Sequence, residues 1–274
     1  MIHAPTRRPA ATHPLPERRV HAPLGCRRGN ELLLPAEEAH YLRRVLRLRA
    51  GEQVAAFDGN GWTAQAEVRS LGGDSCTLAI VRERRLAKPA RGFSVALALL
   101  KAPAMDLAVR ACTELGALSI ATFAAARSVP RVGGDADAKA RAKRWQKIAL
   151  EACRQCGRDF LPETAMRPGP DPAALLRGYD AAFVACLREG SPPLGELLAR
   201  PAAAAASRLL IVTGPEGDFT PAELDALIAA GALPCRLTAE VLRAETAAAA
   251  GAALLSHHLL MGSQRGQTKT MRAE

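Results

Sequence analysis

The rhythm of the sequence changes once, near residue 90, and this change limits the fold more than any other feature. From Gly29 to about Arg85 the chain runs in short stretches, ELLL, EQVAAF, WTAQAEV and SCTLAIV, with a DGNG turn at Asp58 to Gly61. Short stretches of this kind joined by tight turns predict β-strands and suggest a small β-barrel. After LAKPARG, Leu86 to Gly92, strands and helices alternate. We therefore expect two domains with the boundary in this Pro- and Gly-containing stretch.

The second part predicts a mostly parallel α/β sheet. The runs FSVALALL, LSIATFA, AAFVACL and RLLIVT are typical of buried strands. Between them lie helical segments: MDLAVRACTEL ending at Gly116, a long basic helix from about Ala138 to Cys156, and the short GELLA. The alanine run from Ala202 to Ala206 fits a helix end or a linker. Alternating strands and helices build a sheet covered by helices.

Charge favours a nucleic-acid partner without deciding the question. The 274 residues include 37 Lys and Arg against 27 Asp and Glu, a net charge of +10. Such a balance attracts polyanions, but a basic background composition accounts for it equally well. Between the first two strands, AEEAHYLRRVLRLRAG predicts a short helix that concentrates arginines, for which an ordinary amphipathic surface helix is the alternative.

Cysteine usage and hydropathy disfavour other classes of protein. Seven cysteines without framework spacing indicate a reducing cytosol, so we expect a cytoplasmic protein. Cys153 and Cys156 form a C-x-x-C, but no second pair or spaced histidine accompanies them, so we expect no metal. Because His257 and His258 interrupt the best apolar run, it falls short of the ~18 residues of a membrane helix, and we expect no membrane partner. The N-terminal stretch lacks the apolar core of a secretory signal.

A glycine-rich turn follows the strand RLLIVT. Its sequence is Gly214-Pro215-Glu216-Gly217-Asp218-Phe219, and a helix start comes directly after it. Thr220 suits the N-cap, Pro221 the first helical position, and Glu223 completes a capping box. Open α/β sheets bind ligands at the carboxyl ends of their strands, where glycines let the backbone approach closely. The turn is therefore a candidate ligand loop, with an ordinary tight turn as the alternative.

A second candidate loop follows the strand ALPCRL. It runs from Thr238 to Thr246 and continues into an alanine-rich helix. If this loop and the glycine-rich turn leave adjacent strands, both face the same crevice. Arg243 and Glu245 are the strongly polar groups at the start of the helix, and they fit either a chemical role or a surface salt bridge.

These motifs together resemble the SPOUT methyltransferases, and within them the RsmE family, which methylates N3 of a uridine in small-subunit (16S) ribosomal RNA. GPEGDF followed by LTAEVLRAETA is similar to the paired C-terminal motifs of that family. VLRLRAGEQVAAFDGNG resembles its PUA-like barrel, LLKAPAMDLAVRACTELGA its first catalytic-domain helix, and RWQKIALEACRQCGR its long basic helix. The resemblance spans about residues 18 to 264.

The resemblance implies an α/β fold in which a PUA-like β-barrel precedes a SPOUT-type methyltransferase domain with a trefoil knot. We expect a disordered leader at 1–17, the PUA-like RNA-binding domain at 18–86, the methyltransferase domain at 92–266 and a tail at 267–274. The family also implies S-adenosylmethionine as cofactor, small-subunit ribosomal RNA as partner, and a homodimer whose partner chain completes each pocket.

Site residues are carried over at the positions that match. Arg243 would bond a carbonyl oxygen or a phosphate, because an arginine stays protonated, and Glu245 would accept a proton or orient Arg243. The expected cofactor-binding residues are Thr213, Gly214, Pro215, Glu216, Gly217, Leu237, Leu242 and Thr246. The expected RNA contacts are Arg43, Arg44, Arg47, Lys101, Arg127, Arg144 and Arg158.

The chain departs from the family pattern at three positions. Asp218 stands where the family has a glycine, and Thr238 and Glu240 stand where it has Gly and Arg. A bulkier and more negative rim would weaken cofactor binding, which keeps a non-catalytic RNA-binding or ribosome-assembly factor with a degenerate pocket as the alternative. A nucleotide-dependent oxidoreductase is disfavoured, because FSVALALLKAPAMD stands where G-x-G-x-x-G would follow the first strand.

Overall fold

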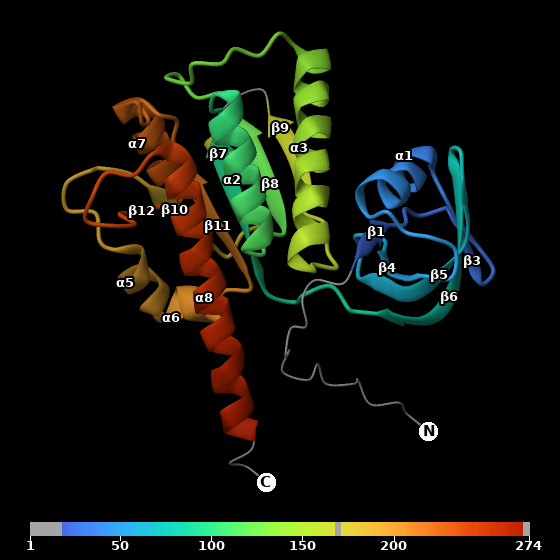
Figure 1. Ribbon diagram of the computed structural model, residues 1–274. Coiled ribbons are helices and arrows are strands. Elements are labelled where there is room, and N and C mark those ends of the chain that lie inside the picture. The colour runs from blue at the N-terminus through green and yellow to red at the C-terminus, as the bar shows by residue number, and fades with distance from the viewer. Residues whose placement is uncertain (1–17, 168–170, 271–274) are drawn as a thin grey trace. The chain divides into compact units, whose positions relative to one another are not determined.

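The computed structural model describes residues 18–167 and 171–270, with side chains through Gly262. The predicted leader, 1–17, and residues 271–274 of the predicted tail lie outside this part. The chain forms two compact units (Figure 1). The first holds the described residues up to Leu86 together with Arg154–Asp159, and the second holds Ala87–Cys153 and the residues from Phe160 onward.

The first unit is built on a mixed six-stranded sheet. Strand β1 pairs parallel to β4, and the remaining pairs are antiparallel, in the order β1-β4-β5-β6-β3-β2. The predicted helix is present as α1 (Ala36–His40), continued by a π-helical turn η1 (Tyr41–Val45). The strands are β1 (Arg19–His21), β2 (Arg27–Arg28), β3 (Glu31–Leu34), β4 (Gln53–Phe57), β5 (Trp62–Gly72) and β6 (Ser75–Arg85). The four predicted strands are confirmed as β3 to β6, and β1 and β2 are additional.

Every second residue of the strands β3 and β4 faces the core of this unit. Leu32 and Leu34 are buried on β3, and Val54 and Ala56 are buried on β4. Because side chains alternate between the two faces of a strand, this arrangement produces the period of two seen in parts of the sequence.

A segment from far along the chain completes the first unit. Arg19 donates from Nη2 to Asp159 Oδ1 at 2.6 Å, and Arg154 forms an ion pair with Glu38. Arg154 and Glu38 are only 8% and 5% exposed, and the Arg154 guanidinium carbon lies 4.2 Å from the centroid of the Tyr41 ring. Burial raises the pKa of Glu38, and the charge of Arg154 partly offsets that effect. The sequence analysis did not anticipate this return of the chain.

The second unit contains a parallel six-stranded sheet in the order β12-β10-β11-β7-β8-β9. Its strands are β7 (Gly92–Ala98), β8 (Ser119–Phe123), β9 (Glu163–Arg167), β10 (Ala181–Ala185), β11 (Arg208–Thr213) and β12 (Leu233–Cys235). Its helices are α2 (Ala102–Glu114), α3 (Asp135–Cys156), α4 (Pro172–Leu176), α5 (Leu194–Ala199), α6 (Pro201–Ala205), α7 (Pro221–Ala229) and α8 (Ala244–Thr270). The predicted parallel α/β arrangement is confirmed, α6 shows that the alanine run is helical, and β9 and α4 were not predicted.

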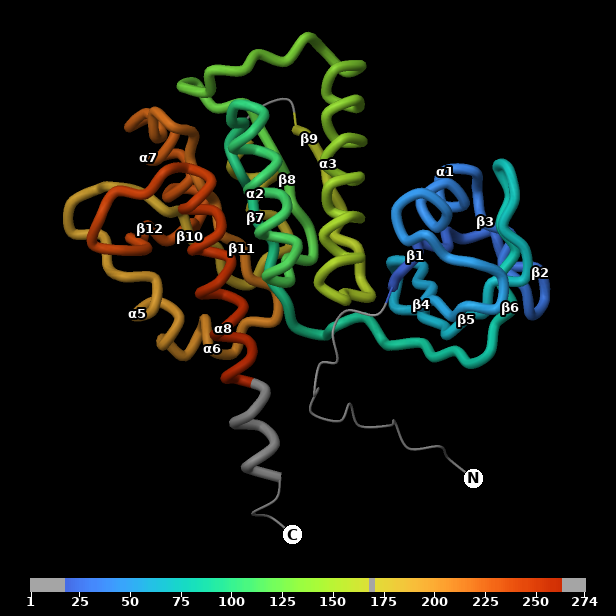
Figure 2. Tube along the Cα trace, viewed as in Figure 1, coloured from blue at the N-terminus to red at the C-terminus, as the bar shows by residue number. Residues whose placement is uncertain are grey.

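Helices cover both faces of this sheet. Val95 and Leu97 of β7 pack in a core with residues of α2, α3, α5 and α8, whereas Ala96 and Ala98 pack in a second core with residues of α4 and α7. Figures 1 and 2 show α2 and α8 lying together on the first of these faces. At Gly251 of α8 an added Cβ would lie 2.9 Å from Ile211 Cγ1, so the missing side chain lets α8 lie close to β11.

Strand order decides which loops meet. The glycine-rich turn and the loop after ALPCRL do not leave adjacent strands, because β10 lies between β11 and β12. The carboxyl ends of parallel strands share one edge of a sheet. The loops after β7, β10, β11 and β12 therefore gather at that edge.

Candidate active site

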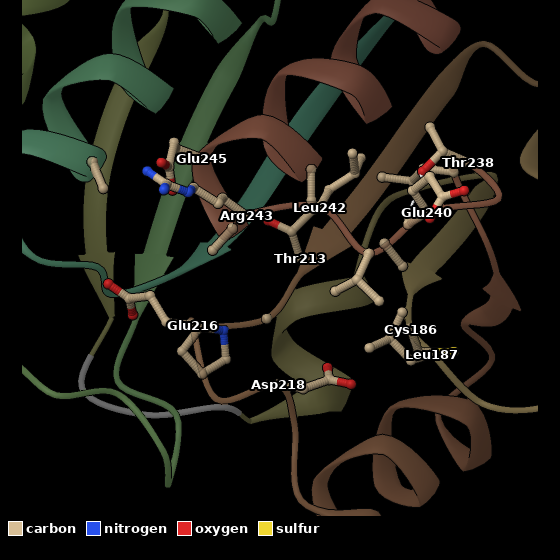
Figure 3. Close-up of a pocket in the computed structure, with 18 of the residues that line it drawn as sticks. Cys186, Leu187, Thr213, Glu216, Asp218, Thr238, Glu240, Leu242, Arg243 and Glu245 are labelled. Carbon is tan, nitrogen blue, oxygen red and sulfur yellow. Dashed lines mark hydrogen bonds between the residues drawn. The ribbon is translucent and has the colours of Figure 1, made fainter.

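The loops at the carboxyl edge of the second unit enclose a cavity of about 810 Å³ (Figure 3). This volume is in the range of small-molecule sites. The wall consists of residues from the β7–α2 loop and α2, the loops after β10 and β11, and the β12–α8 segment: Lys101, Pro103, Ala104, Leu107, Ala185, Cys186, Leu187, Thr213, Gly214, Pro215, Glu216, Asp218, Arg236, Leu237, Thr238, Glu240, Val241, Leu242, Arg243, Ala244, Glu245 and Ala247.

The cavity brings together most of the predicted cofactor and catalytic residues. Among the lining residues are the predicted Thr213, Gly214, Pro215, Glu216, Leu237, Leu242, Arg243 and Glu245. The three departures from the family pattern, Asp218, Thr238 and Glu240, also line it. Gly217 and Thr246 do not. Thr246 is exposed on the first turn of α8.

The glycines of the turn make room for the protein's own side chains. A Cβ at Gly214 would lie 3.2 Å from Asp218 Oδ1 and 3.3 Å from the Phe219 ring. A Cβ at Gly217 would lie 3.2 Å from the Cβ of Arg127. The close approaches at these two glycines are thus to neighbouring side chains of the same unit.

Asp218 adopts a backbone conformation that usually selects glycine. Its φ is 58°, in the left-handed region, which Asp tolerates better than most residues. Its Oδ1 accepts a hydrogen bond from Phe219 N at 2.8 Å, and its own N–H donates to Pro215 O at 3.0 Å. These bonds let an aspartate close a turn in which the family pattern has a glycine.

The β8–α3 loop contacts the glycine-rich turn through Arg127. Arg127 donates from Nη1 to Gly217 O at 2.9 Å and to Phe219 O at 3.4 Å. From the start of α7, Glu223 Oε1 accepts a hydrogen bond from Ala126 N at 2.7 Å. The predicted capping box of α7, in which Thr220 and Glu223 bond each other's backbone, is confirmed. The β8–α3 loop and the start of α7 therefore hold the turn in place.

Thr213 supplies the one buried hydroxyl in the cavity wall, and nothing in the described structure pairs with it. Its side chain is 0% exposed, and its Oγ1 has no hydrogen-bond partner among residues 18–167 and 171–270. Leaving a buried polar group unpaired costs roughly 1–3 kcal/mol. A polar ligand in the cavity would remove that cost.

Arg243 directly precedes α8 and Glu245 lies in its first turn, at one end of the cavity. Figure 3 draws Thr238 and Glu240 at the other end with Thr213 between them. The alternative of a surface salt bridge does not apply, because neither the Arg243 nor the Glu245 side chain forms an ion pair within the described ranges. The amino end of a helix carries a partial positive charge. A developing negative charge near Arg243 would be stabilised by both.

The predicted RNA contacts divide between the two units. Arg43, Arg44 and Arg47 are exposed on or just after η1 of the first unit. Arg158 also belongs to the first unit, and its carbonyl accepts from Arg19.

In the second unit, Lys101 is exposed at the cavity, and Arg127 is bound to the glycine-rich turn. Arg144 pairs with Asp106 of α2 at 2.5 Å. Arg127 and Arg144 therefore already have protein partners.

Sequence reasoning missed part of the cavity wall. Cys186 and Leu187 follow β10 directly, and Arg236 follows β12. The available signal was their position at the carboxyl ends of the predicted strands AAFVACL and ALPCRL. No group of three or more His, Cys, Asp or Glu side chains suited to a metal occurs in the part of the chain described, and no helix there is long and apolar enough to cross a membrane.

Comparison with known proteins shows the family. A family described as RNA methyltransferase domain matches residues 88–256, and one described as RNA methyltransferase PUA domain matches residues 34–81. The ribosomal RNA small subunit methyltransferase E of Bacillus subtilis is 32% identical to this chain over 240 residues, covering 84% of the chain and 92% of that protein. The chain belongs to the RsmE family.

Solved structures agree with this membership. An RsmE protein from Neisseria gonorrhoeae, described as bound to S-adenosyl methionine, superposes with a TM-score of 0.76 at 26% identity, covering 86% of this chain and 96% of that one. A methyltransferase from Legionella pneumophila at 23% identity has the same fold, with a TM-score of 0.79. Within the family, the Mycobacterium tuberculosis RsmE is 32% identical over 225 residues, covering 81% of this chain and 84% of that protein.

Proposed function

We propose that this chain transfers a methyl group from S-adenosylmethionine to N3 of a uridine in small-subunit ribosomal RNA. The observation that carries the proposal is the cavity. The buried Thr213 hydroxyl without a partner, apolar walls, Arg243 and Glu245 come together there, at residues that match the family's two C-terminal motifs. Family membership supports ribosomal RNA as the substrate class.

The residues present fit the cofactor. Thr213 Oγ1 can bond a polar group of S-adenosylmethionine, and Pro215, Leu237 and Leu242 offer apolar surface for its adenine. Four carboxylates in the wall suit a ligand with a sulfonium and an ammonium group. When bound, the cofactor supplies an electrophilic methyl group.

The chain's own residues must position the base and handle a proton. N3 lies on the Watson–Crick edge, so the uridine has to be unpaired or flipped before it reaches the cavity. Arg243 can stabilise the charge that builds on a uracil carbonyl oxygen when N3 loses its proton. Glu245, two residues further on at the same end of the cavity, can accept that proton or orient Arg243.

Replacing Arg243 tests this division of roles. Arg243→Ala should lower the single-turnover methylation rate at saturating RNA by roughly a hundredfold or more, the scale for losing one charge-stabilising donor. Affinity for S-adenosylmethionine, measured by calorimetry, should hardly change. The matched control is Arg177→Ala, an exposed arginine of the same unit outside the cavity wall. A full rate in Arg243→Ala, or methylation mapped by mass spectrometry to an atom other than a uridine N3, would contradict the proposal.

For RNA binding we propose Arg43, Arg44, Arg47 and Lys101 as the main phosphate contacts, because all four are exposed. We keep Arg127, Arg144 and Arg158 as secondary contacts, since they also bond within the protein. We place the enzyme in the cytoplasm, where its substrate is assembled, and we propose the PUA-like and methyltransferase domains at 18–86 and 92–266.

We further propose a trefoil knot and a homodimer, as in the family. The dimer is supported by the apolar side chains that α8 leaves uncovered, Leu260 at 58% and Met261 at 40% exposure. Light scattering should report about twice the 28.9 kDa mass of the chain. Leu260→Glu should shift the protein toward monomer, and a wild-type monomer that methylates at micromolar concentration would refute the dimer.

A further inference from the structure

The cavity wall carries four carboxylates and three basic side chains, in a protein whose net charge is +10. Its acidic residues are Glu216, Asp218, Glu240 and Glu245, and its basic residues are Lys101, Arg236 and Arg243. None of these four carboxylates forms an ion pair with a described residue. Two of them accept a backbone hydrogen bond, Asp218 Oδ1 from Phe219 N at 2.8 Å and Glu216 Oε1 from Lys101 N at 3.4 Å.

Two of the four carboxylates depart from the family pattern. Relative to the family pattern, Asp218 replaces a glycine and Glu240 replaces an arginine. The first change makes the wall more negative by one unit of charge and the second by two. Thr238, the third departure, donates from Oγ1 to the Glu240 carbonyl at 2.7 Å, which fixes the backbone of the loop that carries Glu240.

The buried, unpaired Thr213 hydroxyl points independently to a ligand in the same cavity. The charge of that ligand changes during methyl transfer. The bond between sulfur and the methyl group breaks and leaves its electron pair on sulfur, the bond between the methyl group and N3 forms, and the N3 proton passes to an acceptor. The cationic sulfonium thereby becomes the uncharged thioether of S-adenosylhomocysteine.

We propose that Asp218 and Glu240 make the cavity selective for the sulfonium cofactor over its thioether product, so that the loss of charge on transfer releases the product. This inference rests on the proposed function. Carboxylates at the rim attract a cation over several ångströms, because the effective dielectric constant near a protein surface is lower than that of bulk water. An uncharged sulfur is not attracted in this way. A wall made more negative would then strengthen binding of the cofactor, contrary to the weakening that the sequence alone suggested.

Calorimetry with three ligands tests the proposal. The ligands are S-adenosylmethionine, S-adenosylhomocysteine and sinefungin, which has no sulfur and carries an amine that restores the positive charge. Asp218→Asn retains both the tolerance of a positive φ and an oxygen for Phe219 N, and Glu240→Gln retains the side-chain shape, so each variant removes charge alone. Glu196→Gln, at an exposed position of α5, is the matched control.

Each variant should weaken S-adenosylmethionine and sinefungin by roughly threefold to tenfold and leave S-adenosylhomocysteine unchanged, with a larger effect in the double variant. The preference of the wild type for the two cations should fall as salt increases. Equal weakening of all three ligands, or no change in any, would overturn the proposal while leaving the enzyme's proposed activity intact. Failure of the wild type to bind any of the three would instead overturn the proposed function.

Discussion

At the scale of single residues, the Thr213 side chain indicates that the cavity binds a polar ligand. Thr213 ends β11, is fully buried, and has a hydroxyl without a partner in the described part of the molecule. A side chain of the same shape without the hydroxyl would avoid the cost of desolvating it. The protein therefore keeps this hydroxyl at some expense of stability, as expected of a ligand-binding group.

Thr213→Val should consequently affect stability and binding in opposite directions. The free protein should melt at the same temperature or higher, because an unpaired buried hydroxyl is removed. The dissociation constant for S-adenosylmethionine should rise about tenfold, the worth of one hydrogen bond. Thermal shift assays with and without cofactor measure both effects. A variant that melts lower and binds as tightly as the wild type would show that the hydroxyl serves the fold.

Residue identities could be predicted from the sequence only where a motif marks them. The paired motifs placed Thr213, Leu242 and Arg243 in one site, and the cavity brings them together. The contact of Gly217 with Arg127 could not be predicted, because the two residues lie 90 positions apart in the chain. Contacts at such separations leave no local periodicity for sequence analysis to detect.

At the level of elements, the start of α7 joins the glycine-rich turn to the β8–α3 loop. Glu223 accepts hydrogen bonds from the backbone of Thr220, in the capping box, and from Ala126 in the loop. Burial alone would raise the pKa of Glu223, but these backbone donors outweigh burial and lower it. A carboxyl whose pKa is lowered by folding stabilises the fold above its ordinary pKa and loses that contribution as pH falls through the folded value.

Glu223→Ala should therefore lower the melting temperature at pH 7 by about 2–4 °C, corresponding to roughly 1 kcal/mol for a capping residue in a chain of this size. The difference from the wild type should shrink as pH falls below the ordinary glutamate value of 4.5. Glu196→Ala provides the comparison with an exposed glutamate. A difference that stays constant from pH 7 to pH 4 would exclude the carboxylate as its source.

Most elements could be predicted, because buried strands and capped helices carry strong local patterns. The strand β9 was missed because ETAMR is only partly buried and shows no clear alternation. The order of strands could not be derived, since nothing in the composition of β10, β11 or β12 states which two are neighbours. Sheet order is fixed by packing across the whole unit.

At the scale of the whole molecule, the first unit depends on residues 154–159, which are contributed by a distant part of the chain. Within that unit Arg154 and Glu38 form a buried ion pair. Removing one member of such a pair leaves an uncompensated buried charge and is expected to cost about 3–5 kcal/mol, whereas removing both costs less. The sequence predicts two domains that are each continuous in the chain. No motif indicates that residues 154–159 pack with the first unit.

Arg154→Met should destabilise the first unit strongly, and the double variant Arg154→Met with Glu38→Leu should recover much of the loss. The chain has two tryptophans, Trp62 in the first unit and Trp145 in the second, so Trp145→Phe makes urea unfolding of the first unit visible by fluorescence alone. All variants are compared in that background. A double variant as unstable as the Arg154 single variant would show that the pair's charges are not coupled.

The strand order has a consequence for how the protein is made. β7 occupies the middle of its sheet, but its neighbour β11 is synthesised more than a hundred residues later. During translation one edge of β7 thus stays open, and pairings between distant parallel strands form slowly. Residues as far along the chain as Ala247 line the cavity, so its wall is complete only after that residue has been synthesised. We therefore expect the growing chain to be prone to aggregation until β11 has been synthesised and pairs with β7.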